Sequence, residues 1–204
     1  MPYLVDTPRG LARVTADDPA GAAPPRALLV LGHGAGGGVE APDLLAVTRT
    51  AVELGIQVLR VEQPYRVAGR RAATPAAQLD EAWLAVLAAV AVDGVPLLVG
   101  GRSSGARVAC RTAAAGGARG VLCLAFPCHP PGKPDKSRLP ELDAVTVPTL
   151  CVAGSRDPFG VPPERAGREV LVVEGADHAL RRDLAMVRAA VGGWLTTQVG
   201  VTGE

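Results

Sequence analysis

Residues 97–107, Leu97-Leu98-Val99-Gly100-Gly101-Arg102-Ser103-Ser104-Gly105-Ala106-Arg107, carry the strongest structural signal in the chain. An apolar run typical of a buried strand ends at a Gly-x-Ser-x-Gly motif, and an Ala-rich helical pattern follows at once. This context predicts a tight strand-to-helix turn with a strained serine at its apex. The flanking glycines Gly101 and Gly105 let the chain pass close to its neighbours. We therefore expect the Ser103 hydroxyl above the end of the strand, where N–H groups of the next helix point.

The rest of the chain alternates between short apolar runs and longer segments with helical periodicity. Strands are predicted at Ala27–Leu31, Gln57–Val61, Pro96–Gly100, Gly120–Phe126, Thr149–Ala153 and Glu169–Val173, after an N-terminal hairpin of Tyr3–Thr7 and Leu11–Thr15. Helices are predicted at Pro42–Leu54, Pro75–Val92, Ser104–Ala115, Pro162–Ala166 and Arg182–Gln198. Continuous apolar strands indicate a sheet that is covered on both faces. The pattern predicts the α/β class, with one domain over residues 1–204, a mostly parallel central sheet, helices on both faces and no cap domain.

Composition and charge narrow the function classes. The chain has 21 Lys and Arg against 20 Asp and Glu, and this net charge of +1 gives no basis for binding nucleic acid or an anionic membrane. The N-terminus shows no signal peptide, and the longest apolar stretch, Trp83 to Val92, is too short to span a bilayer. The four cysteines lack the spacing of a metal site and are interpreted as small buried apolar residues. We expect a reduced, cytoplasmic protein.

The ends of the predicted strands carry the residues with catalytic chemistry. Parallel strands bring their carboxyl ends to one edge of a sheet, where ligands bind. Ser103, Asp157 and His178 each follow a predicted strand, in the chain order of the α/β-hydrolase catalytic triad. A serine hydroxyl needs an adjacent base, and a neutral imidazole oriented by a carboxylate supplies one. The sequence therefore predicts Ser103 as nucleophile, His178 as base and Asp157 as the orienting acid.

Two other histidines compete with His178 for the role of base. His33 lies in the glycine-rich loop after the first central strand and is expected to shape that turn. His129 lies in a proline-rich loop after the strand 120–126, where it would line the pocket. His178 is favoured because it alone follows the last predicted strand.

Three other acids compete with Asp157. Asp177 directly precedes His178 in the sequence and cannot easily curl round to orient its ring. Asp135 and Glu141 lie in the loop after the strand 120–126, and Asp135 is the runner-up. Asp157 is favoured because it follows a strand of its own.

A glycine-rich loop is expected to complete the site. His33-Gly34-Ala35-Gly36-Gly37 resembles the oxyanion turn of esterases, in which the N–H groups of Ala35 and Ser104 would bind the oxyanion. The alternative is a dinucleotide phosphate loop, because Gly34-x-Gly36-x-x-Val39 is close to that motif. Arg102 is expected to pair with a surface acid or to face a substrate carboxylate. Substrate contacts are predicted for His33, Gly34, Tyr65, Arg102 and His129.

Several strings of residues resemble those of a known family. They are Leu31-Gly32-His33-Gly34-Ala35-Gly36, Glu62-Gln63-Pro64-Tyr65-Arg66, Gly100-Gly101-Arg102-Ser103-Ser104-Gly105, Pro127-Cys128-His129-Pro130-Pro131-Gly132-Lys133-Pro134 and Gly175-Ala176-Asp177-His178. The whole chain resembles compact, lidless α/β hydrolases related to dienelactone hydrolases. Within these it is most similar to the bacterial relatives of the testis-expressed and histone-acetyltransferase-subunit-like hydrolase proteins. The resemblance implies the same triad, but dienelactone hydrolases use a cysteine nucleophile, so lactone specificity does not carry over.

These expectations combine into one functional hypothesis and one alternative. The hypothesis is a serine hydrolase that cleaves a small carboxylic ester, thioester or lactone through an acyl-enzyme, with no metal or organic cofactor. The alternative is a catalytically silent hydrolase-fold interaction module. Hydrolysis and acyl transfer are left open by the sequence, as are the physiological substrate, the oligomeric state, and whether residues 63–73 and 128–142 act as a lid.

Overall fold

The computed structural model describes residues 2–21, 24–71 and 74–200. The strands are β1 (Tyr3–Thr7), β2 (Gly10–Asp17), β3 (Leu28–Gly32), β4 (Gln57–Glu62), β5 (Leu97–Arg102), β6 (Gly120–Leu124), β7 (Thr149–Gly154) and β8 (Arg168–Val173). The helices are α1 (Pro42–Glu53), α2 (Pro64–Val67), α3 (Ala76–Val90), α4 (Ser104–Thr112), α5 (Leu139–Asp143) and α6 (Leu184–Gly200). The predicted alternation of strands and helices is confirmed, including the N-terminal hairpin.

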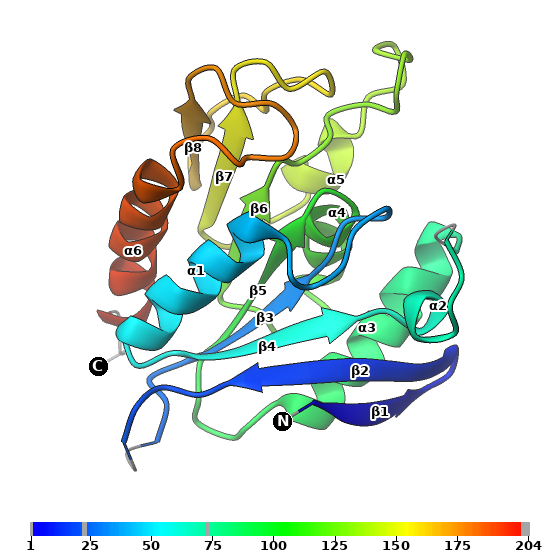
Figure 1. Cartoon of the computed structure of the whole chain (residues 1–204), viewed down its shortest axis with the longest axis vertical. Helices are drawn as coiled ribbons and strands as arrows, with labels where there is room; N and C mark the ends of the chain where they lie inside the picture. The colour runs from blue at the N-terminus through cyan, green and yellow to red at the C-terminus, as the bar shows by residue number, and fades with distance from the viewer. Residues whose placement is uncertain (1, 22–23, 72–73, 201–204) are drawn as a thin grey trace.

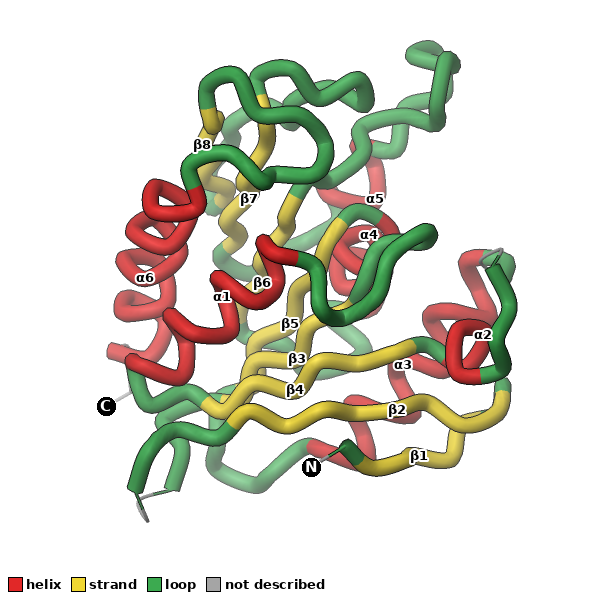
Figure 2. The backbone as a smooth tube through the Cα atoms, in the orientation of Figure 1, coloured by secondary structure: helices red, strands yellow, loops and turns green. Residues whose placement is uncertain are grey.

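The eight strands form one sheet in the order β1-β2-β4-β3-β5-β6-β7-β8. Strand β2 is antiparallel to both of its neighbours, and the six strands from β4 to β8 in that order are parallel. The sheet twists, so that β1 and β2 cross the lower part of Figure 2 while β7 and β8 run nearly upright. The mostly parallel sheet brings the loops after β3, β5, β7 and β8 to one edge.

Helices cover both faces of the sheet, as predicted. Helices α1 and α6 pack together on one face, and α3 and α4 pack together on the other (Figure 1). This arrangement explains why β3, β6 and β7 are buried along their whole length. Each face has its own apolar cluster, one containing Trp83 and the other Trp194.

The four cysteines are free and buried, in agreement with their interpretation as apolar residues. The sulfur atoms of Cys110 and Cys123 lie 3.4 Å apart between α4 and β6. Burial raises the pKa of the Cys128 thiol to about 11. A thiol with so high a pKa is almost entirely protonated at neutral pH, and therefore a poor nucleophile.

The predicted helix at Pro162–Ala166 is wrong. Residues 161–164 have no regular structure, and Arg165 forms an isolated bridge with Arg168 across a tight turn. Pro163 disfavours the helical conformation at Pro162, the residue before it, and Gly167 turns the chain with a φ of +76°. Conversely, the short helices α2 and α5 were not predicted from the sequence.

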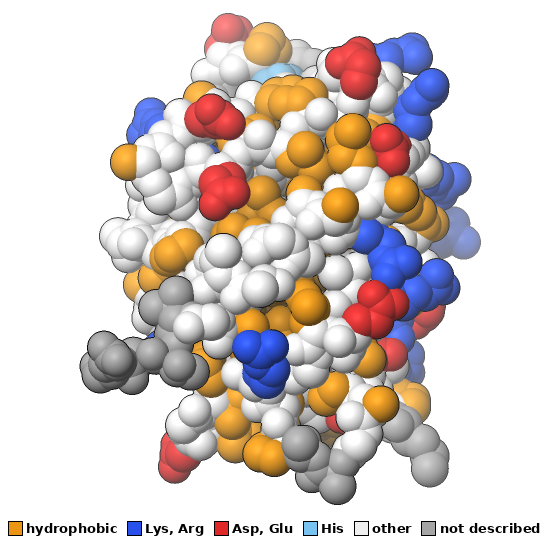
Figure 3. All heavy atoms as spheres, turned by 90° about the vertical axis from the view of Figure 1, so that its left-hand side faces the viewer, with side chains coloured by type: hydrophobic (Ala, Val, Ile, Leu, Met, Phe, Trp, Pro, Cys, Tyr) orange, Lys and Arg blue, Asp and Glu red, His pale blue; other side chains and the backbone are white. Residues whose placement is uncertain are grey.

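The helical face with α1 and α6 exposes hydrophobic side chains in patches that charged side chains interrupt (Figure 3). Every helix in the described part of the chain is too short or too polar to cross a bilayer. Apart from the helices that cover the sheet, the described parts of the connections between strands contain the short helices α2 and α5. None of these described parts forms a cap domain.

Candidate active site

Ser103 lies at the turn between β5 and α4, with a φ of 53° and a ψ of −109°. A positive φ is uncommon for a residue with a side chain, so this backbone is strained. Its N–H donates to the Leu124 carbonyl oxygen over 2.9 Å, which fixes the turn to β6. A Cβ atom on Gly101 or Gly105 would overlap the Gly32 carbonyl oxygen on β3. The two glycines of the motif are therefore required for close approach, as the sequence predicts.

Ser103, His178 and Asp157 form one chain of hydrogen bonds. The Ser103 Oγ lies 2.9 Å from His178 Nε2, and His178 Nδ1 lies 2.8 Å from Asp157 Oδ2. The other Asp157 oxygen accepts the Phe159 N–H over 2.9 Å. The Asp157 carboxyl is fully buried, whereas 21% of the His178 side chain is exposed. A carboxylate at Nδ1 favours the tautomer whose free Nε2 accepts the serine proton.

The rival acids lie elsewhere. Asp177 Oδ1 accepts the N–H of Ala179 within its own turn over 2.9 Å. Glu141 is bound by Arg107 and Arg111. Asp135 is exposed in the loop before α5. Within the described residues, Asp157 is thus the acid that the structure places against a histidine ring.

The rival histidines are engaged by the backbone. The buried His33 ring donates from Nδ1 to the Gly34 carbonyl oxygen over 2.8 Å and accepts the Gln63 N–H at Nε2 over 3.1 Å. Burial lowers the pKa of His33, in keeping with a neutral ring that does both. His129 Nδ1 lies 2.9 Å from the Pro130 carbonyl oxygen. Backbone groups occupy both ring nitrogens of His33, so neither nitrogen is free for the predicted contact with substrate.

The glycine-rich loop after β3 lies beside Ser103. A Cβ on Gly34 would come within 3.5 Å of the Ser103 Cβ. The His33 bond to the Gly34 carbonyl holds the peptide unit whose N–H belongs to Ala35, and a trans peptide points that N–H the opposite way. The buried Tyr65 hydroxyl donates to the Ala35 carbonyl oxygen over 3.1 Å. Tyr65, predicted to contact substrate, therefore positions the loop instead.

Ser104 is the first residue of α4. The first N–H groups of a helix have no acceptor within it, so the Ser104 N–H is available to a ligand. Ser104 and Ala35 line the same hollow as Ser103. The two predicted oxyanion donors thus flank the candidate nucleophile.

Arg102 pairs with a buried acid rather than a surface one. Its Nε donates to Asp43 Oδ2 over 2.8 Å, and its Nη2 donates to the His178 carbonyl oxygen over 2.7 Å. The Asp43 side chain is fully buried in the first turn of α1. Sequence reasoning missed Asp43, although a signal exists: it shares the spacing of the buried residues Val47 and Thr50 on α1.

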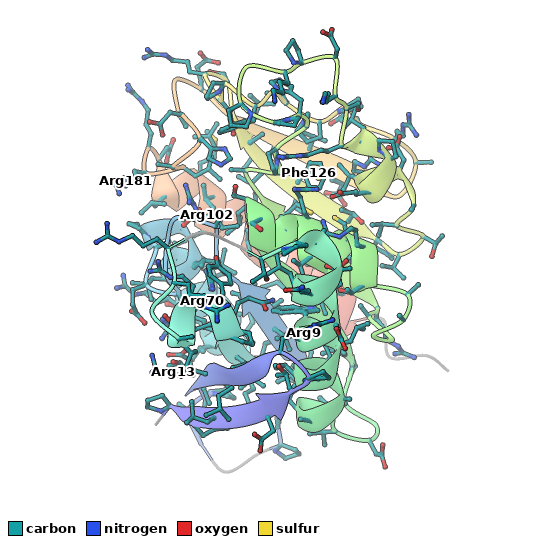
Figure 4. The ribbon with its side chains drawn as sticks, turned by 90° about the vertical axis from the view of Figure 1, so that its right-hand side faces the viewer. Arg9, Arg13, Arg70, Arg102, Phe126 and Arg181 are labelled. Atoms are coloured by element: carbon teal, nitrogen blue, oxygen red, sulfur yellow. The ribbon has the colours of Figure 1, made fainter. Side chains whose placement is uncertain are left out.

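Ser103 lines two hollows. The larger, of about 610 Å³, is lined by the loop 34–38, by His178 and by Arg102 and Arg181, which lie near one another in the upper left of Figure 4. The smaller, of about 300 Å³, is lined by Ser104, the start of α3 and the loop after β6. Phe159 lines both hollows, and its ring meets the His178 ring edge-on at 4.4 Å. Phe159 was not predicted to belong to the site.

No group of three or more His, Cys, Asp and Glu side chains in the described ranges is placed to hold a metal ion. The glycine-rich loop, for which the alternative prediction was dinucleotide binding, lines the larger hollow together with Ser103 and His178. The loop therefore belongs to the same site as the candidate nucleophile and base.

Comparisons with known proteins show the family and the fold of the chain. A family model described as an alpha/beta hydrolase domain matches residues 25–186. Among solved structures, the chain is similar to an α/β serine hydrolase without a lid from Xanthomonas campestris, at 23% identity and a TM-score of 0.79, over 100% of this chain and 96% of that one. It is also similar to Est1E from Butyrivibrio proteoclasticus with ferulic acid bound, at 19% identity and a TM-score of 0.79, over 97% and 99% of the two chains.

Dienelactone hydrolase from Anabaena variabilis shares the fold as well, at 17% identity and a TM-score of 0.71, over 97% of each chain. No curated protein matches the chain. The likeness to these structures confirms the predicted fold, and the family match covers well over half of the sequence. The chain belongs to the alpha/beta hydrolase family.

Proposed function

We propose that the protein is a serine hydrolase that cleaves a small carboxylic ester, thioester or lactone through an acyl-enzyme. The observation that carries this proposal is the continuous hydrogen-bond chain from Ser103 Oγ through His178 to Asp157. A serine in such a chain can lose its proton as it attacks, which an isolated serine cannot do at neutral pH.

The reaction begins when Ser103 Oγ attacks the acyl carbon and His178 Nε2 takes the hydroxyl proton. The N–H groups of Ala35 and Ser104 stabilise the oxyanion of the tetrahedral intermediate, a contribution worth about 10²–10³ in rate for each donor. His178 then returns the proton to the leaving oxygen or sulfur as the bond to the acyl carbon breaks. Water repeats the same steps on the acyl-enzyme and frees the acid.

We assign the two parts of the substrate to the two hollows from the residues that line them. His178 must reach the leaving atom to protonate it, and His178 lines the larger hollow. The leaving group therefore occupies the larger hollow. The acyl chain occupies the smaller hollow, beside Ser104 and Ala35.

Labelling with a fluorophosphonate probe tests the proposal, because the probe reacts only with an activated serine. We expect the wild type to be labelled and to hydrolyse 4-nitrophenyl acetate and butyrate, and Ser103→Ala and His178→Ala to lose both activities. Ser137→Ala, which alters an exposed serine in the loop before α5, is the matched control and should behave as the wild type. A folded wild type that is neither labelled nor active would contradict the proposal and support the interaction-module alternative.

A further inference from the structure

The smaller hollow beside Ser103 is unusually rich in arginine. Arg107 and Arg111 reach it from α4, and Arg138 reaches it from the residue before α5. Its other walls are mostly apolar and include Leu79 and Pro127. Three guanidinium groups do not suit a plain hydrocarbon chain, because such a chain would displace water from the charged groups without offering them hydrogen bonds.

Two of the arginines are neutralised by carboxylates. Arg107 binds Glu141 through Nε at 2.8 Å and Nη2 at 2.5 Å. Arg111 binds Asp80 through Nε at 2.8 Å and Nη2 at 2.6 Å, and Glu141 through Nη1 at 3.0 Å. Burial would raise the pKa of Glu141, but its bonds to the two arginines outweigh burial and lower it. The carboxylates of Asp80 and Glu141 are therefore both engaged by Arg107 and Arg111.

Arg138 has no such partner. Its one side-chain hydrogen bond runs from Nη1 to the His129 carbonyl oxygen at 3.5 Å, and it forms no ion pair with any acid in the described part of the chain. The hollow thus carries three positive charges against two negative ones. Partial burial and the charges of Arg107 and Arg111 lower the pKa of Arg138, so its cation is held in an unfavourable place.

From this charge imbalance we infer that the smaller hollow binds a carboxylate carried by the acyl group of the substrate. The inference rests on the proposed function and on the assignment of the acyl chain to this hollow. A guanidinium presents paired N–H donors that match a carboxylate, and Arg138 has donors to spare. The apolar walls would take the methylene groups between the two ends. The preferred substrate class is therefore a monoester or monothioester of a short dicarboxylic acid.

A pair of substrates isolates the effect of the carboxylate. The 4-nitrophenyl monoester of adipic acid and 4-nitrophenyl hexanoate have the same leaving group and matched chains, and differ at the far end of the acyl group. We expect the wild type to favour the adipate monoester in kcat/KM. Arg138→Gln should lower kcat/KM for the monoester about tenfold or more and change that for hexanoate by less than about twofold. Arg138→Lys should recover part of the loss, because it keeps the charge without the fork.

Two further arginine variants serve as comparisons. Arg119 is exposed at the amino end of β6, so Arg119→Gln removes one positive charge far from the site and should leave the preference unchanged. Arg181 lines the larger hollow. If Arg181→Gln rather than Arg138→Gln abolished the preference, the carboxylate would lie on the leaving-group side and the inference would be wrong. Equal turnover of the two substrates by the wild type would also overturn it.

A binding measurement separates this inference from the proposed function. Sodium adipate is titrated into ¹⁵N-labelled wild type and Arg138→Gln, and the arginine Nε–H resonances are followed by NMR. Saturable shifts in the wild type alone support the carboxylate site even if neither ester is hydrolysed, an outcome that would contradict only the hydrolase proposal. Hydrolysis of hexanoate without adipate binding or preference would contradict only the carboxylate site.

Discussion

Arg102 donates a hydrogen bond from Nη2 to the backbone carbonyl oxygen of His178 over 2.7 Å. The residue next to the candidate nucleophile thus holds the loop of the candidate base, although the two are 76 residues apart in the chain. The second bond of the guanidinium, to the buried Asp43 carboxylate, fixes its orientation. The distance between Ser103 and His178 therefore depends on a residue that takes no proton itself.

Arg102→Gln is expected to destabilise the protein. Removal of the guanidinium leaves the Asp43 carboxylate buried without a counter-charge, which costs roughly 3 kcal/mol of unfolding free energy. Urea denaturation measures this change. The double variant Arg102→Gln/Asp43→Asn removes the stranded charge, so it should be more stable than Arg102→Gln alone. If the double variant lost as much stability as Arg102→Gln and Asp43→Asn lose in sum, the two residues would not be coupled.

Asp157→Asn is expected to lower kcat strongly while the fold is kept. The amide can still accept the Phe159 N–H, but it no longer favours the His178 tautomer with a proton on Nδ1. We expect a loss of about 10³- to 10⁴-fold, with an unchanged circular dichroism spectrum. Asp177→Asn is the matched control, since the Asp177 carboxyl bonds within its own turn, and it should retain activity within about twofold. A larger loss in Asp177→Asn than in Asp157→Asn would exchange their roles.

His33 is expected to make the stability depend on pH. Burial lowers the pKa of His33 in the folded state, whereas the unfolded chain has a value of about 6.5. The folded state therefore binds the proton less well. The stabilising contribution of neutral His33 is fully present above pH ~6.5 and is lost as the pH falls toward the lowered folded-state value.

Urea denaturation of the wild type and His33→Gln between about pH 8 and pH 5 measures the effect as a difference. The stability of the wild type should fall more steeply than that of His33→Gln below pH ~6.5. Parallel curves would show that protonation of His33 does not disrupt its bonds to Gly34 and Gln63.

A glycine variant in the first turn of α4 tests the packing of that helix against β3. Gly105→Ala places a methyl group against the Gly32 carbonyl, and we expect a loss of about 3 kcal/mol of unfolding free energy. Gly193→Ala is the matched control, because its Cβ meets no atom within 4 Å and it lies in the exposed part of α6. It should stabilise the protein by up to about 1 kcal/mol through helix propensity. Equal effects of the two changes would refute the argument from close approach.

The sequence predicts the parts of this molecule that depend on local pattern. Most of the parallel strands are continuous apolar runs, and Ser103 has a glycine on either side at fixed spacing. Both features follow from the residues at one place in the chain. The single domain over residues 1–204, the cytoplasmic location and the roles of the site residues stay predictions.

The features that escaped prediction depend on contacts between distant residues. A lone aspartate in a helix pattern is usually solvated, whereas Asp43 is buried against Arg102, a counter-charge 59 residues away in the chain. Phe159 joins the site because the turn after Asp157 folds its ring against His178. Tyr65 lies under the loop at Ala35 rather than in the pocket. Apart from the helical spacing that Asp43 shares with Val47 and Thr50, these positions have no local signature.

The candidate triad is divided between the centre and the edge of the sheet. Ser103 follows β5, whereas His178 comes 75 residues later, after the edge strand β8. A chain in which β8 has not yet joined the sheet holds the serine without its base. Under the proposed chemistry, such a chain cannot trap a substrate as a covalent adduct while it is still folding. Recovery of activity during refolding would accordingly report the addition of β8 rather than the formation of the central strands.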